Sequence, residues 1–335
     1  MKIIVDAYGG DYAPLEAIKG ALDAKQEYGY DIVLTGNEEE IRRIAAEQQW
    51  PLEGIDIVNA TDVISMNDSP KSILREHKEC SMAVGLRLLA EGAGDAFVSA
   101  GSTGALIMGA TFIVKRIKGI SRPALAAVVP SAKGPFMLVD SGANVDCRAD
   151  MLLQFAHMGS IYMTEVMKQG CPATVGLLNV GTEEHKGGDL QHETYALLKE
   201  SGLNFIGNVE ARDVPAGVAD VVVTDGFGGN VLLKGMEGTV DMLLGFLKDI
   251  LYATPLTKLA ALTMKSRFGG LKKKLSTAEY GGAPLLGVAK PVIKAHGNSK
   301  AYAIKNAIRV AGECVTADVV GKIAGTVSRE SEGDD

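Results

Sequence analysis

Three glycine-rich turns in this sequence have the composition of an anion-binding site. They read SAGSTGAL at 99–106, TDGFGGNVLLK at 224–234 and HGNSKAY at 296–302, and each lies between a short apolar run and a helical pattern. Glycine lets backbone N–H groups point at a ligand, and the N-terminus of a helix favours negative charge. If the preceding strands are parallel neighbours, the three turns lie at one edge of a sheet, where ligands bind in such folds. The residues expected to hold phosphate are Gly101, Ser102, Thr103, Gly104, Gly228 and Gly229.

Two further polar segments follow predicted strands. VDSGANVD at 139–146 carries Asp140 and Asn144, and NVGTEEHKG at 179–187 carries His185 and Lys186. For each residue alone, a turn or helix-cap role is the structural alternative. His185 and Lys186 together favour catalysis, because loops that leave strand ends commonly carry catalytic groups.

The sequence lacks the motifs that several other kinds of enzyme would require. The chain has no GxxxxGK[ST] motif and no GxGxxG motif after a strand, so dependence on ATP or NAD is disfavoured. It also has no GxSxG elbow and no papain-like cysteine context, which argues against an acyl-enzyme on serine or cysteine. The four cysteines are far apart and have no histidine at metal spacing, so we expect no disulfide framework, no metal and no cofactor.

The elements that must position these turns are short strands alternating with helices. Apolar runs such as KIIVD, DIVLTG, FMLVD and ADVVVTD are each followed by a helical pattern, which predicts βαβ units and a mostly parallel sheet flanked by helices. The uncharged stretch 96–114 is predicted to be a strand, a glycine turn and a buried helix rather than a membrane span. No repeat or linker divides the 335 residues, so we expect a single catalytic domain, 1–335, in two α/β lobes.

The region 235–280 is predicted to be a helical protrusion. Pro255 interrupts a long helix, and residues 250–278 carry six basic residues and no acidic one, although the chain has a net charge of −7. This amphipathic pattern is typical of a helix in a dimer interface or of one that contacts a membrane or an acidic partner. The overall negative charge argues against nucleic acid as a partner. The residues expected to bind an acidic carrier are Lys265, Arg267, Lys272 and Lys273, and those expected at a membrane are Leu256, Leu259, Leu262 and Met264.

The chain also resembles a known family in motif order and spacing. The segments DAYGGDYAP, SAGSTGAL, VDSGANVD, NVGTEEHKG, GNVEARD, TDGFGGNVLLK, YGGAPLLGV and HGNSK are similar, in this order, to the motifs of the acyl-ACP:phosphate acyltransferase family, also called PlsX, where ACP is acyl carrier protein. The family usually has methionine where this chain has Tyr8, which puts local pocket shape in doubt.

The resemblance implies a fold like that of isocitrate and isopropylmalate dehydrogenases, in a homodimer. It implies transfer of a fatty acyl group from acyl-ACP to inorganic phosphate without metal or nucleotide, giving acyl phosphate for phospholipid synthesis. The enzyme would be cytoplasmic and peripherally attached to an anionic membrane surface, where a membrane acyltransferase uses the acyl phosphate. The start MKIIVDAYGG has no apolar stretch of a signal peptide, which agrees with that location.

This reaction needs no covalent nucleophile on the enzyme. Phosphate is already nucleophilic, and a thiolate leaves readily because the pKa of its thiol is only about 8.5. We therefore expect Lys186 to pair with phosphate or the developing charge, His185 to donate a proton to the thiolate, and Asn230 to contact a carbonyl or phosphate. The residues expected to organise the site are Asp140, Asn144, Asp225, His296 and Ser299.

Three other functions remain open. A phosphotransacetylase performs the same chemistry with coenzyme A as the acyl carrier, and a thioester assay distinguishes the two. An NAD(P)-dependent decarboxylating dehydrogenase of similar fold would need clustered metal-binding aspartates and substrate arginines, which the sequence does not show. A membrane-bound ACP scaffold without activity fits poorly with so many polar turns.

Overall fold

The structure is a computed structural model that describes residues 1–167, 170–275 and 277–332. Within these ranges it leaves out the side chains of Ala260, Lys265, Ser266, Leu271, Lys272, Lys273 and residues 329–332.

Within the described residues, eleven strands form one sheet in the order β3-β2-β1-β4-β11-β10-β5-β6-β9-β7-β8. Apolar, β-branched side chains fill most strands, and helices cover the sheet, as expected for strands buried on both faces. The strands are β1 Lys2–Asp6, β2 Asp31–Gly36, β3 Ile55–Asn59, β4 Ala96–Ser99, β5 Ala124–Ser131, β6 Gly134–Val139, β7 Thr174–Asn179, β8 Asn204–Glu210, β9 Val221–Val223, β10 Ala283–Leu286 and β11 Val292–Lys294.

The direction of the strands reverses in the middle of the sheet. Strands β3, β2, β1, β4 and β11 are parallel, and so are β6, β9, β7 and β8. Between these two sets, β10 is antiparallel to β11 and to β5, and β5 is antiparallel to β6. The mostly parallel α/β fold predicted from the sequence is therefore confirmed, with β9 running opposite to β4 and β11.

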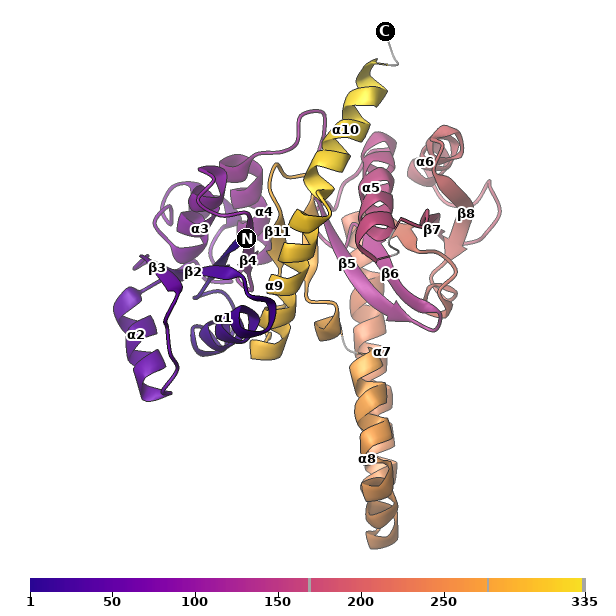
Figure 1. Cartoon of the computed structure of the whole chain (residues 1–335). Coiled ribbons are helices and arrows are strands. Elements are labelled where there is room, and N and C mark those ends of the chain that lie inside the picture. The colour runs from indigo at the N-terminus through magenta and orange to yellow at the C-terminus, as the bar shows by residue number, and fades with distance from the viewer. Residues whose placement is uncertain (168–169, 276, 333–335) are drawn as a thin grey trace.

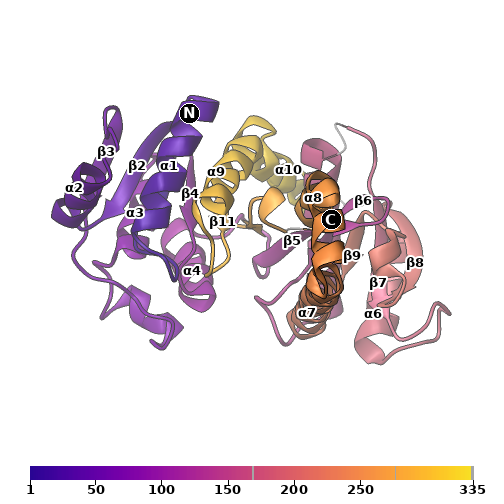
Figure 2. The same ribbon diagram turned by 90° about the horizontal axis from the view of Figure 1, so that it is seen from below.

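Two lobes are visible in Figure 1, with α9 and α10 between them. We call the set from β3 to β11 the first lobe and the set from β5 to β8 the second lobe; Figure 2 shows the same division from below. A π-helical turn, Ala110–Val114, continues α4. The α-helices are α1 Leu15–Tyr28, α2 Glu38–Glu47, α3 Ser81–Ala90, α4 Thr103–Gly109, α5 Ala149–Tyr162, α6 Asp189–Glu200, α7 Gly226–Tyr252, α8 Pro255–Leu275, α9 Ala301–Thr316 and α10 Val319–Glu332.

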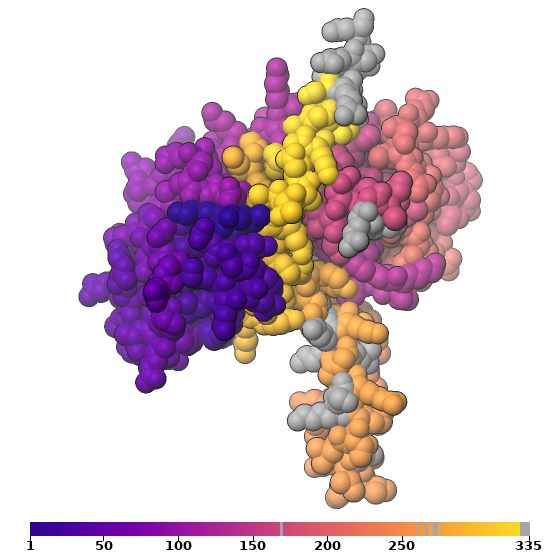
Figure 3. Space-filling model, viewed as in Figure 1, coloured from indigo at the N-terminus to yellow at the C-terminus, as the bar shows by residue number. Residues whose placement is uncertain are grey.

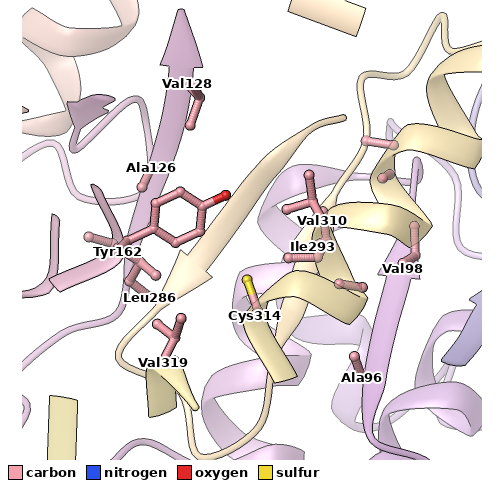
Figure 4. Packing of buried hydrophobic residues seen from close by; sticks show 14 of the residues in the cluster. Ala96, Val98, Ala126, Val128, Tyr162, Leu286, Ile293, Val310, Cys314 and Val319 are labelled. Carbon is pink, nitrogen blue, oxygen red and sulfur yellow. The ribbon is translucent and has the colours of Figure 1, made fainter. Parts of the chain in front are cut away.

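One hydrophobic core joins the lobes. Figure 4 shows Val98 of β4 and Ile293 of β11 on one side, and Ala126 of β5 with Tyr162 of α5 on the other. Val310 of α9 packs in the same cluster. Helix α9 packs on β1, β4 and β11 of the first lobe, and α10 packs on both α9 and α5 of the second lobe, which fixes the lobes relative to each other.

Helices α7 and α8 form a hairpin that protrudes from the second lobe (Figures 1 and 3). They pack against each other, and Pro255 begins α8. This agrees with the helical break predicted at that proline. Among the described helices, none is both long enough and apolar enough to cross a membrane.

Candidate functional site

The turn after β4 is held by a buried carboxylate. Asp6 at the end of β1 accepts hydrogen bonds from the hydroxyls of Ser81 at 2.6 Å and Ser99 at 2.7 Å. Ser99 Oγ accepts in turn from the amide of Gly101 at 3.0 Å. Burial raises the pKa of Asp6, and the hydrogen bonds to its carboxylate oppose that shift. The ends of β1 and β4 are thereby fixed as one unit beneath the predicted phosphate turn.

The N-terminus of α4 has uncommitted donors. Ser102 caps the helix by accepting from the amide of Ala105 at 3.5 Å. Within the described residues, no group accepts a hydrogen bond from the amides of Thr103 or Gly104, or from the Thr103 hydroxyl. The half-buried Thr103 and Gly104 line a cleft of about 1160 Å³. This turn therefore has the donors that the sequence analysis assigned to it.

A buried lysine lies behind the same turn. Lys294 ends β11, is 6% exposed, and donates from Nζ to the carbonyls of Ala100, at 3.3 Å, and Ala295. Burial lowers the pKa of Lys294 from 10.5 to about 8, against the attraction of Asp6 and Asp11. The lysine links the two strand ends that carry the 101–104 and 296–299 turns.

This lowered pKa has a measurable effect on stability. Between about pH 8 and 10.5 the folded lysine is neutral while the unfolded one is still charged, so unfolding takes up a proton. The contribution of Lys294 to the free energy of unfolding should therefore rise with pH across this window. We expect the unfolding free energy of the native protein minus that of Lys294→Met to increase as the pH rises from 8 to 10. Denaturant titrations measure both values. A difference that stays constant would contradict the lowered pKa.

Asp140 organises the loop that follows β6. The carboxylate is fully buried and accepts five hydrogen bonds, from the amides of Leu125, Gly142, Ala143 and Asn144 and from Asn144 Nδ2, at 2.7 to 3.1 Å. Burial raises its pKa, and the N–H donors oppose that shift by favouring the charged form. Asn144 Nδ2 also donates to the carbonyl of Pro123 at 2.8 Å. The contacts of Asp140 and Asn144 fit the organising role predicted for them.

The first turn of α7 packs directly on this loop. Gly226 donates its amide to the carbonyl of Asn144 at 2.7 Å, and Asp225 caps the helix by accepting from the amide of Gly228 at 2.7 Å. A Cβ on Gly229 would lie 1.9 Å from the carbonyl oxygen of Asp140. Only glycine allows this approach.

Gly228 and Gly229 were expected to hold phosphate, but both of their amides already donate hydrogen bonds. The amide of Gly228 donates to the Asp225 carboxylate, and the amide of Gly229 donates to the Asp225 carbonyl at 3.0 Å. Their direct contact with phosphate stays a prediction, and the structure adds a packing reason for the two glycines.

The next residue, Asn230, is different. Its half-buried side chain has no hydrogen-bond partner within the described part of the chain. It lies beside Gly142, where an added Cβ would be 3.9 Å from Asn230 Oδ1. Gly142 and Asn144 line the same cleft as Thr103 and Gly104. A free carboxamide is thus held next to the cleft, as a ligand-binding group requires.

The expectation that all three glycine turns share one edge is wrong for one of them. Strands β4 and β11 are parallel neighbours, and the register pairs Lys294 with Ser99, so their turns lie together. Strand β9 runs the other way and lies in the second lobe. Its turn contacts the 140–144 loop, which lines the cleft together with α4. The turns therefore come from two lobes instead of one edge.

His185 and Lys186 lie in the loop after β7. Because β7 and β9 are adjacent and parallel, this loop leaves the same edge of the second lobe as Asp225. His185 is exposed, and Lys186 Nζ is 4.0 Å from Glu183 Oε1 with 43% of its side chain exposed. Within the described residues, neither of the two is hydrogen-bonded to Asn230. Their catalytic roles stay predictions, and the weak ion pair leaves Lys186 free to turn toward an anion.

His296 and Ser299 lie at the first-lobe turn. The His296 side chain is exposed, whereas Ser299 is 8% exposed and donates its amide to the His296 carbonyl at 3.0 Å. Gly297 accepts from the amide of Asp11 at 2.8 Å, which joins this turn to the loop after β1. The two residues therefore neighbour the 101–104 turn, on the Asp11 side.

Tyr8 points away from the cleft. Its ring lies over Gly36, where a Cβ would be 2.5 Å from the ring, and its hydroxyl donates to Glu40. Burial is the main reason that its pKa is raised. A tyrosine at this position therefore changes the packing against β2 and α2, not the shape of the cleft.

The cleft has an apolar wall in addition to its donors. Side chains of α4 and of the π-helical turn after it, including Ile107, Met108 and Phe112, line one side. Phe112 is 61% exposed. The cleft thus combines an apolar wall with the free donors near Thr103. Within the described residues, no group of three or more His, Cys, Asp or Glu side chains could hold a metal ion.

Sequence reasoning missed two of the residues that support this site. Ser99 was seen only as part of a glycine turn, and Lys294 was not singled out. The available signal was the position of each residue at the end of a buried strand, where a selected turn begins or follows.

The fold and the cleft define a class of two-lobed α/β enzymes. Solved structures with the same fold include the EutD phosphotransacetylase from Staphylococcus aureus, with a TM-score of 0.59 and 16% identity over 95% of this chain and 94% of that one. A putative 4-hydroxythreonine-4-phosphate dehydrogenase from Salmonella typhimurium has a TM-score of 0.54 and 12% identity, over 93% and 98% of the two chains. At such identities the likeness shows the fold alone.

Sequence relatives are much more similar. A phosphate acyltransferase from Thermoanaerobacterium thermosaccharolyticum is 48% identical over 337 residues, covering 100% of this chain and 98% of the relative. The family described as "Fatty acid synthesis protein" matches residues 1–322. The chain belongs to the phosphate acyltransferase family and is an acyltransferase, which confirms the resemblance seen in its motifs.

Proposed function

We propose that this acyltransferase moves a fatty acyl group from the thioester of acyl-ACP to inorganic phosphate, and that the acyl phosphate serves glycerophospholipid synthesis. The observation that carries the proposal is the cleft, which combines an apolar wall with free donors. The wall at Ile107, Met108 and Phe112 suits an acyl chain. The free amides of Thr103 and Gly104 suit phosphate, because a helix N-terminus favours an anion.

The reaction can proceed by positioning and charge stabilisation alone. A phosphate oxygen attacks the thioester carbon, a C–O bond forms, and the C–S bond breaks to release a thiolate that takes up a proton. Holding both reactants in line can supply roughly 7–11 kcal/mol of the barrier reduction. In this proposal Asn230 donates to the developing oxyanion, Lys186 pairs with the phosphate charge, and His185 supplies the proton to the thiolate.

The acyl carrier is tested by comparing two thioesters with the same acyl chain. The purified enzyme is mixed with phosphate and either acyl-ACP or acyl-coenzyme A, and acyl phosphate is trapped with hydroxylamine as the hydroxamate. We expect a much larger kcat/KM with acyl-ACP. Preference for acyl-coenzyme A would assign a phosphotransacetylase instead, the activity named for one of the proteins with this fold.

We also propose a role for the α7–α8 hairpin in dimer and membrane contact. Leu256, Leu259 and Leu262 are 77%, 62% and 66% exposed, and Met264 is 42% exposed. On α7, the side chains of Phe246 and Ile250 are similarly exposed. Apolar patches of this kind mark interaction sites. A homodimer would cover part of the hairpin. The rest would bind the cytoplasmic surface of an anionic membrane, near the membrane acyltransferase that uses acyl phosphate.

The carrier-binding role expected on α8 stays a prediction. Arg267 is exposed, as a docking residue would be. The side chains of Lys265, Lys272 and Lys273 lie outside those that the structure describes.

Replacing two exposed leucines of α8 by acids tests the membrane role. Burying a leucine in the lipid interface contributes roughly 1.5–3 kcal/mol, so a few leucines with nearby lysines suffice for reversible binding. We expect the native protein to co-sediment with anionic vesicles and to be released by salt. Leu259→Glu with Leu262→Glu should abolish co-sedimentation and keep activity on soluble acyl-ACP. Loss of dimer and activity together would instead place these leucines in the dimer interface.

A further inference from the structure

The segment between α4 and β5 carries a cluster of unpaired positive charge. Lys115, Lys118 and Arg122 are all exposed, and within the described residues none of them has an acidic partner. The sequence has no acidic residue between Asp95 and Asp140. Other cations at the surface form ion pairs, for example Lys2 with Asp56 at 3.1 Å and Arg42 with Glu38 at 2.7 Å. We call residues 115–122 the basic strap.

The basic strap has a defined shape. Arg116 donates its guanidinium to the carbonyl of Ile120 at 3.3 Å and to that of Ser121, and the side chains of Ile117 and Ile120 are buried. Gln154 of α5 donates to the carbonyl of Gly119 and accepts from the amide of Ser121, both at 2.9 Å. The charged side chains therefore project from an ordered segment.

Residues of the basic strap line the cleft together with α4. Phe112, 61% exposed, lies three residues before Lys115 and lines the same cleft. Gly104, at the other end of α4, is ten residues before Val114, which corresponds to roughly 15 Å along a helix. A thioester carried on a flexible arm could enter beside Phe112 and reach the donors near Thr103 along the apolar wall.

The strap and the tip of the hairpin are far apart. The strap is followed by Pro123, which Asn144 contacts, and Asn144 also contacts Gly226 in the first turn of α7. The tip of the hairpin at Tyr252 is 26 residues further along α7, roughly 39 Å away. A membrane bound by the hairpin tip would leave the strap open to a soluble partner.

We propose that the basic strap, with Phe112 as its aromatic anchor, is the docking surface for an acidic protein that presents the acyl thioester to the cleft. This inference rests on the proposed function, because it names the surface where the carrier binds. Unpaired cations attract an acidic partner and raise the rate of encounter, and an exposed aromatic side chain in such a patch is typical of a binding anchor. The strap lines the cleft, whereas none of the described basic residues of α8 does, and this favours the strap over α8.

The test reverses the three free charges in the variant Lys115→Glu, Lys118→Glu, Arg122→Glu. Arg116 is kept because it holds the strap in shape. A second variant, Lys258→Glu, Arg267→Glu, Lys274→Glu, reverses three exposed cations of α8 and tests the other surface expected to bind the carrier. Steady-state kinetics are measured with acyl-ACP and with a small acyl-pantetheine thioester, and thermal unfolding and oligomeric state are compared with the native protein.

We expect the strap variant to raise the KM for acyl-ACP by about tenfold or more and to lose most of its salt dependence. The KM for phosphate and the turnover of acyl-pantetheine should stay unchanged, and the α8 variant should raise the KM for acyl-ACP by less than the strap variant does. An unchanged KM for acyl-ACP in the strap variant, or a larger effect in the α8 variant, would overturn the proposal. So would an equal loss with acyl-pantetheine, loss of the dimer, or loss of vesicle binding with normal carrier kinetics. A native protein inactive on acyl-ACP would instead refute the proposed function.

Discussion

Replacing Asn230 by alanine should lower turnover by about tenfold or more without lowering stability. The Asn230 carboxamide has no hydrogen-bond partner within the described residues, so its removal breaks no bond that supports the fold. It lies beside Gly142 at the cleft, where a donor could meet the negative charge that develops on the thioester oxygen. Losing one such donor typically costs roughly 3–4 kcal/mol of transition-state stabilisation.

Lys186→Ala should have a similar effect on turnover for a different reason. The ammonium group is only loosely paired with Glu183, at 4.0 Å, and most of the loop's side chains are exposed to solvent. Its charge is therefore available to phosphate at little cost in stability. A change confined to the KM for phosphate would give Lys186 a binding role only.

Two control variants distinguish a loss of turnover caused by Asn230→Ala or Lys186→Ala from a general loss of folded protein. Asn204→Ala removes an exposed carboxamide at the start of β8, and Lys133→Ala removes an exposed ammonium in the turn between β5 and β6. Both controls should keep native kcat and the native thermal midpoint. If Asn230→Ala and Lys186→Ala also keep native kcat, the chemistry takes place at the first-lobe turns alone.

Local sequence patterns were sufficient to predict most elements of this fold. Buried strands such as β1, β2 and β9 are runs of β-branched residues between turn signals, so their composition alone indicates their state. The hairpin was recognisable from the length of α7 and from Pro255. The strand reversal at β10 was not, because it is set by tertiary pairing of a four-residue strand with β11 and β5.

The site was predictable to the extent that turn chemistry defines it. Asp140, Asn144 and Asp225 were identified because carboxylates and amides after a strand commonly hold a loop or cap a helix. Which donors remain free could not be predicted, since this depends on contacts between distant segments. The amide of Gly228 is occupied and those of Thr103 and Gly104 are free, although all three glycine-rich turns have similar sequences.

The basic strap was missed for the same reason. Lys115, Lys118 and Arg122 are three of 34 basic residues, and the richer cluster on α8 drew attention first. Only the structure shows that these three lack acidic partners within the described residues and line the cleft. Charge density along a sequence locates basic segments, whereas pairing across the fold decides which of them stay available.

Gly229→Ala should damage both the fold and the site. The new Cβ would lie 1.9 Å from the carbonyl oxygen of Asp140 and 3.0 Å from Thr224 Cγ2. The carbonyl cannot move aside freely, because the Asp140 side chain fixes its loop through five hydrogen bonds. The first turn of α7 must shift instead, which should lower the free energy of unfolding by about 3 kcal/mol.

The same shift should reduce activity, since Asn230 is the next residue on α7 and moves with it. We expect turnover to fall by about tenfold or more. The control is Gly235→Ala, two turns further along α7, where a Cβ would meet nothing within 4 Å. That variant should be neutral or more stable by up to about 1 kcal/mol, because alanine favours a helix more than glycine does. Denaturant unfolding and kcat measured on both variants decide the matter. Native stability and turnover in Gly229→Ala would show that α7 and the Asp140 loop are not in close contact in solution.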